Sequence, residues 1–171
     1  MIEEEVTETP AEDSDIDTTE LSKDINLRLG QTMVQIMEIH ALKNDLQKGM
    51  TFRTAAEKYI LTATKDDKKN VHYVKFLQAS GNMYFKSQDS KDISKAYDFY
   101  DEANKILEEI VGNKSIDFLL SLVDIGEVYL YQRDYKKSDA FLTFCKEEMI
   151  KYYGNDSIFI NRVNSALIEV F

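Results

Sequence analysis

The chain has 171 residues, with 31 Asp or Glu against 21 Lys or Arg and a net charge of -10. This length suits one domain with a sizeable core and is short for two independent ones. Nine of the acidic residues and none of the basic ones lie in the first twenty positions, which leaves 22 acidic against 21 basic residues in the rest. An acidic tail and a nearly neutral folded region do not fit a nucleic-acid-binding protein.

Residues 1–20, MIEEEVTETPAEDSDIDTTE, are predicted to form an acidic disordered tail. A segment so charged and so poor in large apolar residues buries too little surface to offset the entropy of ordering it. It either solubilises the chain or docks on a basic partner. The start lacks the positive charge of a secretory signal, and no apolar run approaches the roughly 18 residues of a membrane span. We therefore expect no membrane partner and a cytoplasmic location.

The predicted folded domain spans residues 21–171 and begins with a degenerate helix pair at 21–66. Residues 21–48 form one long helical pattern, with apolar or weakly polar side chains at Leu21, Ile25, Leu29, Met33, Ile36 and His40. The segment TFRTAAEKYILTATK supplies a second helix with Ala56, Ile60 and Ala63 on one face. Spacings of three and four residues are typical of a helix with one buried side.

Residues 71–112 and 115–154 are two copies of one pattern. At an offset of 45, the first copy's Leu77, Gly81 and Tyr84 recur as Leu122, Gly126 and Tyr129. At an offset of 42, Ala96, Tyr100, Ala103, Leu107 and Gly112 recur as Ser138, Leu142, Cys145, Met149 and Gly154. The difference of three predicts three extra residues in the internal turn of the first copy, around KSQDSKD.

Each copy is predicted to form a pair of helices. The first helix of the second copy carries two neighbouring apolar stripes, one through Phe118 and Leu122 and one through Leu119 and Val123, so it is predicted to be sandwiched between other helices. We expect a left-handed cap at the glycine that ends each copy, Gly112 and Gly154, and an N-cap at the serine three residues later. A further helix at 157–171 has no return partner and is predicted to act as an atypical cap.

These positions resemble the tetratricopeptide repeat. That signature places Gly or Ala three residues before Tyr in the first helix, and small, large and small residues at intervals of four and three in the second. The second copy fits without a gap through Gly126, Tyr129, Ser138, Leu142 and Cys145. The 42-residue period with Gly-Asn between units is similar to the kinesin light chain type. The resemblance implies an all-α, antiparallel helix-pair solenoid of about two to three repeats plus the C-terminal helix.

The resemblance also implies a concave groove lined by the first helix of each pair, where an extended peptide or a helix binds. The lining positions would be Lys75, Gln78, Asn82, Phe85, Lys86, Leu120, Val123, Glu127, Leu130, Tyr131 and Arg162. The groove would combine an apolar strip with cationic edges at Lys75, Lys86 and Arg162. The alternative is that neighbouring helices cover Leu120, Val123 and Leu130.

Some tetratricopeptide-repeat domains bind the C-terminal carboxylate of a chaperone through Lys, Asn, Asn, Lys and Arg. The matching positions here are Gln78, Asn82, Asp124, Arg162 and Ala166, so we predict against that role.

No motif favours catalysis, a cofactor or a metal. The single cysteine, Cys145, cannot form an internal disulfide and falls at a small-residue packing position, so we expect a buried, inert thiol. Neither His40 nor His72 stands near it with metal-ligand spacing. There is no glycine-rich phosphate loop and no nucleophile elbow.

The resulting hypothesis is a non-enzymatic adaptor or scaffold subunit that binds a protein or peptide partner. Association through the C-terminal end at Val170 and Phe171 is a second expected contact. One alternative is a regulatory or chaperone-like module with an autoinhibitory acidic tail, and another is the repeat portion of a longer protein. The Tyr-, Lys-, Asn- and Asp-rich composition suits a protist with an AT-rich genome, where such proteins serve in cytoskeletal, ciliary or transport complexes.

Overall fold

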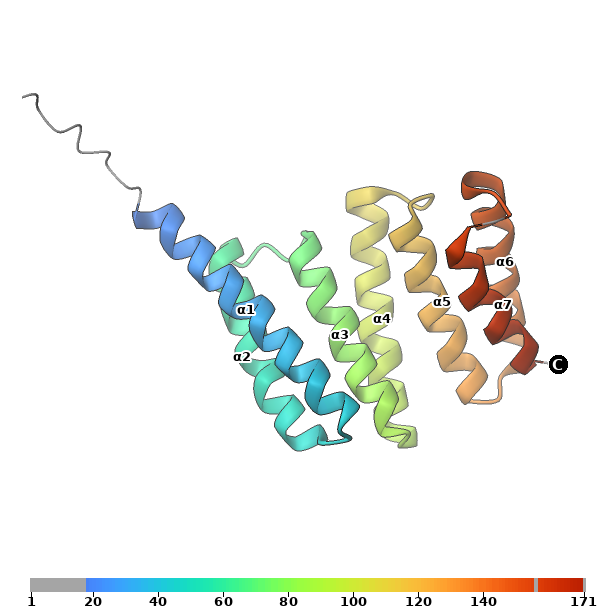
Figure 1. Cartoon of the computed structure of the whole chain (residues 1–171), viewed down its shortest axis with the longest axis horizontal. Helices are drawn as coiled ribbons and strands as arrows, with labels where there is room; N and C mark the ends of the chain where they lie inside the picture. Colours follow the sequence, from blue (N-terminus) through green and yellow to red (C-terminus); the bar gives the residue numbers. More distant parts are fainter. Residues whose placement is uncertain (1–17, 156, 171) are drawn as a thin grey trace, which may run out of the picture.

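The computed structural model describes residues 18–155 and 157–170, and this part of the chain folds into helices with no strand. The helices are α1 (Thr18–Leu42), α2 (Leu46–Thr64), α3 (Val71–Ser87), α4 (Ser90–Val111), α5 (Ile116–Tyr131), α6 (Tyr135–Tyr153) and α7 (Ile158–Val170). They stack side by side in chain order, with α1 and α2 at one end and α6 and α7 at the other (Figure 1). The predicted all-α solenoid of antiparallel helix pairs is confirmed.

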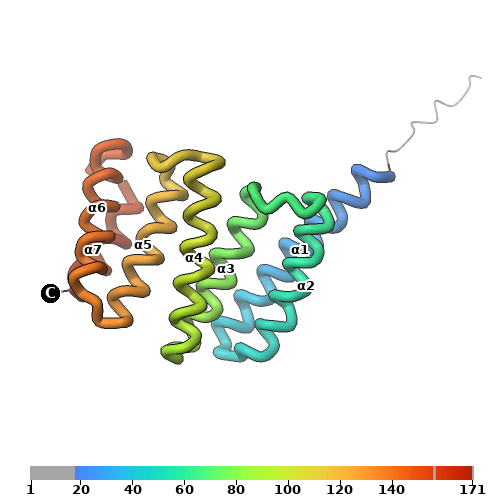
Figure 2. The backbone as a smooth tube through the Cα atoms, turned by 180° about the vertical axis from the view of Figure 1, so that it is seen from behind, coloured from blue at the N-terminus to red at the C-terminus, as the bar shows by residue number. Residues whose placement is uncertain are grey.

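Two opposite views show how the pairs are oriented. The first helices α1, α3, α5 and α7 form one face of the stack, and the return helices α2, α4 and α6 form the other (Figures 1 and 2). Helix α3 packs on α1, α2 and α4, while α5 packs on α4, α6 and α7. The core is therefore continuous from the first pair to the last, as expected when each unit covers the apolar face of its neighbour.

The first pair differs from the prediction at both ends of its first helix. Helix α1 begins at Thr18, so Thr18–Glu20 belong to a helix and the predicted tail boundary at residue 20 is wrong. The rest of that tail, residues 1–17, lies outside the described residues. The predicted helix at 21–48 is also broken, because Asn44 takes a positive φ of 55° and Asp45 then caps α2 by accepting the Lys48 amide. This early break lets α2 fold back along α1.

Close helix contacts lie at the small residues that the repeat pattern identified. A Cβ added to Gly81 would lie 2.5 Å from Cε1 of Tyr100, and one added to Gly126 would lie 2.9 Å from Cδ2 of Leu142. Ser138 is fully buried and its hydroxyl donates to the Gly126 carbonyl at 2.9 Å. These contacts bring α3 against α4 and α5 against α6, so the small residues are needed for the pairs to close.

The three extra residues of the first copy do not enlarge its turn. Only Gln88 and Asp89 separate α3 from α4, whereas three residues separate α5 from α6. Gln88 ends α3 with a φ of 57°, and the Asp89 side chain accepts the Lys91 amide to start α4 at once. The insertion instead lengthens the beginning of α4, which runs for 22 residues against 19 for α6. The prediction of a longer turn is wrong because a good N-cap favours an added helical turn over a loop.

Glycine and tyrosine residues organise the junctions between units. Gly112 and Gly154 have φ values of 83° and 81° with ψ near 160°. This is a region open to glycine alone and differs from the predicted left-handed cap. Ser115 caps α5 as predicted by accepting the Phe118 amide at 3.2 Å. Two tyrosine hydroxyls donate to backbone carbonyls in these connecting segments. Tyr131 of α5 donates to the Gln88 carbonyl between α3 and α4 at 2.6 Å, and Tyr153 of α6 donates to the Lys114 carbonyl between α4 and α5 at 3.0 Å.

The last helix, α7, closes the described stack with a more polar outer side. Asn161 and Asn164 stand where α5 has the buried Leu119 and Leu122, one period earlier. Ile168, at the position of Gly126, is 77% exposed. Val170 is half-buried against the core, so part of its side chain remains exposed at the predicted C-terminal contact, and Phe171 lies outside the described residues. The exposed apolar surface of α7 is therefore carried by Ile158 and Ile168, which are 75% and 77% exposed.

Candidate partner-binding groove

Three adjoining hollows follow the face formed by the first helices of the pairs. A hollow of about 470 Å3 lies between α1 and α3. A second of about 450 Å3 lies among α3, α5 and α7, and a third of about 880 Å3 continues to the turn between α5 and α6. Gln78 and Asn82 line the first two, and Arg162 lines the last two. We call this continuous row the groove.

The widest part of the groove has an aromatic wall. Phe85 of α3 and Tyr131 of α5 meet edge to face, with ring centroids 5.9 Å apart. The hydrogen bond from the Tyr131 hydroxyl to the Gln88 carbonyl holds the tyrosine ring in place. Leu130 lies beside them and is half-buried, while Arg133 and Tyr135 form an exposed rim. A fixed apolar wall with polar groups at its edge is suited to one large apolar side chain of a partner.

The middle of the groove contains an ion-pair cluster that joins α5 to α7. The Arg162 guanidinium donates to both carboxylate oxygens of Glu127, at 3.0 and 2.8 Å, and to Oδ1 of Asp124 at 2.5 Å. Two-oxygen binding of a carboxylate by arginine is both strong and directional. Because two carboxylates already surround it, Arg162 offers little charge to an anionic ligand. The prediction that Arg162 is a cationic edge of the groove is therefore wrong.

Burial raises the pKa values of two groups at this cluster, Asp124 and Tyr100. Burial raises the pKa of Asp124 to about 6, against the lowering effects of the charge and the hydrogen bond of Arg162. The carboxylate side chain is only 12% exposed. The Tyr100 hydroxyl donates to the Asn82 side chain at 2.7 Å, and its pKa is raised by burial and by the negative charges of Asp124 and Glu127. The middle of the groove thus contains two polar contacts, the Tyr100–Asn82 hydrogen bond and the ion pairs of Arg162, rather than an open apolar strip.

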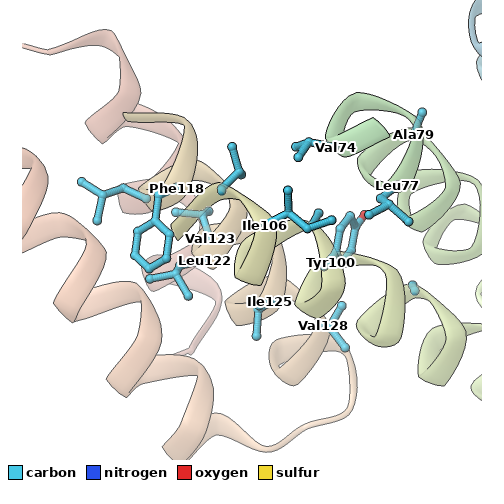
Figure 3. Packing of buried hydrophobic residues seen from close by; sticks show 14 of the residues in the cluster. Val74, Leu77, Ala79, Tyr100, Ile106, Phe118, Leu122, Val123, Ile125 and Val128 are labelled. Atoms are coloured by element: carbon cyan, nitrogen blue, oxygen red, sulfur yellow. The ribbon is translucent and has the colours of Figure 1, made fainter. Parts of the chain in front are cut away.

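Ten of the eleven predicted groove residues line the groove, and one, Val123, does not. Val123 is fully buried in the core of α5, where Figure 3 shows it among packed side chains. The prediction for Val123 is wrong because α5 is apolar on two sides, and the repeat alignment alone did not show which side faces the groove. Ten residues line the three hollows: Lys75, Gln78, Asn82, Phe85, Lys86, Leu120, Glu127, Leu130, Tyr131 and Arg162.

Several lining residues were not predicted from the sequence. On α1 they are Gln31, Val34, Gln35 and Glu38, which the degenerate first pair left without an alignment. Burial raises the pKa of Glu38, while the nearby positive charge of Lys86 lowers it. At the other end, Arg133 and Tyr135 follow the helix that carries Tyr131, and Glu169 comes from α7. Arg133 supplies an exposed positive charge at the rim of the groove.

Of the remaining residues singled out in the sequence, Cys145 and His40 are part of the packing, whereas His72 lines the first hollow. Cys145 is fully buried, its Sγ lies 3.5 Å from the Leu119 carbonyl, and burial raises the pKa of the thiol to about 12. His40 stacks on Phe52, with ring centroids 5.4 Å apart. His72 lies 3.2 Å from the Gln31 side-chain nitrogen. Within residues 18–155 and 157–170, no three His, Cys, Asp or Glu side chains gather as they would around a metal ion.

Comparison with known proteins assigns no family to the chain. No family model matches it, and no curated protein shows significant sequence similarity to it. Among the described helices, none combines the length and the apolar character needed to cross a membrane.

Proposed function

We propose that this protein is a non-enzymatic adaptor or scaffold subunit that binds a segment of another protein in the groove. The observation that carries the proposal is the continuity of the three hollows along α1, α3, α5 and α7, with an aromatic wall at the widest point. A row of this kind is long enough for an extended peptide or a short helix, which are the usual ligands of helical solenoids.

The tetratricopeptide-repeat assignment belongs to this proposal. Its support is the position of the small residues: Gly81, Gly126 and Ser138 lie at the close helix contacts where that repeat places small side chains. A cytoplasmic setting, in a cytoskeletal, ciliary or transport complex, is part of the same proposal and follows from composition.

The side chains that line the groove indicate which class of ligand it would bind. Phe85, Leu130 and Tyr131 favour a ligand with one large apolar anchor. Lys75 and Lys86, both exposed, favour acidic or carbonyl-rich flanks beside the first two hollows. A lone C-terminal carboxylate is disfavoured, because Arg162 is already paired with Asp124 and Glu127. We therefore expect an internal apolar motif rather than a chain terminus.

The experiment is selection of linear peptides on the full chain from a display library, followed by binding measurements on variants. Lys86→Glu and Leu130→Ser should each weaken the selected peptides by about tenfold or more, which is the effect of losing roughly 1.4 kcal/mol. The control is Lys136→Glu, an exposed site on α6 outside the residues that line the groove. Peptides that bind with unchanged affinity to both groove variants would rule out the groove as the ligand site.

A further inference from the structure

The outward side of α1 carries a second apolar stripe, which no described residue covers. Leu21, Ile25, Leu29 and Ile39 are 50, 48, 37 and 48% exposed. The buried residues of the same helix, Gly30, Met37 and Ala41, lie on the opposite side and face α2 and α3. A helix that packs on the solenoid with one side only has no folding reason to be apolar on the other.

The spacing of this stripe is that of a coiled-coil seam. Its central members are Ile25, Leu29, Thr32, Ile36 and Ile39, at successive intervals of four, three, four and three residues. That alternation keeps side chains aligned along a helix when it packs against another helix. Thr32 fits the seam because its hydroxyl donates to the Arg28 carbonyl at 2.8 Å, which satisfies the polar group within its own helix. We call these five residues the α1 seam.

We propose that the α1 seam binds the α1 seam of a second copy of this chain, with the two helices antiparallel. A two-fold contact needs a surface that is complementary to itself. The seam meets this condition about Thr32: Ile25 and Ile39 lie seven residues to either side, and Leu29 and Ile36 lie three and four residues away. An antiparallel pair would therefore set Ile25 against Ile39, Leu29 against Ile36, and Thr32 against Thr32.

Charge favours the antiparallel direction. Residues 1–17, which precede α1, contain eight Asp or Glu and no basic residue. A parallel pair would set two such segments at the same end and bring their charges together. In the antiparallel pair the end of α1 that follows residues 1–17 lies opposite the C-terminal end of the other copy's α1, where Lys43 is exposed. Repulsion of like charges is thereby replaced by attraction.

The position of α1 leaves room for the second copy. Its first turns extend beyond the rest of the stack in both views (Figures 1 and 2). Four residues of α1 line the groove, and none of them is a member of the seam: Gln31, Val34, Gln35 and Glu38. Dimerisation and occupation of the groove are therefore independent, and the failure of one leaves the other standing. Because the seam is short, we expect a dissociation constant on the order of 10 µM.

Sedimentation equilibrium of the full chain from 1 to 200 µM tests the association. We expect a monomer–dimer equilibrium that Ile25→Asp weakens by about tenfold or more, as expected when a charge is placed in an apolar contact between two helices. The matched control is Ile158→Asp on α7, a site 75% exposed and outside the seam, which should leave the equilibrium unchanged. Circular dichroism of each variant verifies that the fold is retained.

Cysteine cross-linking tests the direction of the pair. Under mild oxidation Thr32→Cys should form a disulfide with itself. Ile25→Cys should not do so alone, but should form a mixed disulfide with Ile39→Cys when the two variants are combined. The native Cys145 is fully buried, so the parent chain serves as the negative control. A monomer at 200 µM, a dimer insensitive to Ile25→Asp, or an Ile25→Cys homodimer would each overturn the proposal.

Discussion

Replacing Arg162 with methionine should destabilise the protein by an amount that depends on pH. The substitution keeps most of the side-chain volume but leaves Asp124 and Glu127 facing each other without their shared cation. Breaking a fully buried ion pair costs about 3–5 kcal/mol. Arg162 is 43% exposed and water will replace part of the lost interaction, so we expect a loss of about 2 kcal/mol at pH 7.5.

The pH dependence follows from Asp124. Its pKa of about 6 in the folded protein is above the ordinary value of 3.8, so the folded state holds this proton more tightly than the unfolded state does. The contribution of Asp124 to stability is therefore greatest below pH 3.8 and declines as the pH rises through 6. Removing Arg162 removes the charge that lowers this pKa, so the decline should extend to higher pH. Between pH 5 and 7.5 the variant should lose more stability than the parent protein.

Urea unfolding followed by circular dichroism at pH 5.0, 6.0 and 7.5 measures these differences. Adding Asp124→Asn to Arg162→Met should restore much of the loss and flatten its pH dependence, because the uncompensated charge is gone. The control is Arg133→Met at the rim of the groove, which should change stability by less than about 0.5 kcal/mol at all three pH values. An equal loss at pH 5.0 and 7.5, or a double variant no more stable than Arg162→Met, would refute the reasoning.

Three further expectations concern the core, a helix contact and the tail. Val123→Glu should lower the free energy of unfolding by about 3 kcal/mol or more, since a charge would be placed at a fully buried site. The control Val123→Ile should cost less than about 1.5 kcal/mol. A small effect of Val123→Glu in urea unfolding would show that Val123 lies on the groove surface. Gly81→Ala should cost about 1–3 kcal/mol because the new methyl group meets the Tyr100 ring, and adding Tyr100→Leu should recover part of the loss in the same assay. Deleting residues 1–17 should leave the melting temperature and the affinity for selected peptides unchanged, and tighter binding would instead support the autoinhibitory alternative.

The repeat architecture was predictable because close packing restricts residue size. Only a small residue can occupy positions 81 and 126, where the ring of Tyr100 and the side chain of Leu142 approach the helix backbone. These restrictions recur in each unit, so the period and the pairing can be obtained from one sequence. The boundary at Asp45 was harder to predict, because the apolar pattern runs through it from one helix into the next and only the capping side chain marks the break.

The groove was only partly predictable, for two physical reasons. Helix α5 is buried on more than one side, so the position of Val123 in the pattern fits a core residue and a lining residue equally well. The pairing of Arg162 with Asp124 and Glu127 joins residues 38 and 35 positions apart, and no local spacing predicts such a bond. Phe85 and Tyr131 were both predicted as lining residues, but no feature of the sequence indicated that their rings meet.

The hydrogen bonds that Tyr131 and Tyr153 donate across the junctions affect how the stacked helices unfold. The Tyr131 bond ties the internal turn of one unit to the first helix of the next, and the Tyr153 bond ties the end of α6 to the linker before α5, so unfolding of the second unit releases both contacts. In a linear array such nearest-neighbour ties set the length over which unfolding spreads. Stretched from its ends, a molecule of this kind should yield in steps that begin at a terminal pair.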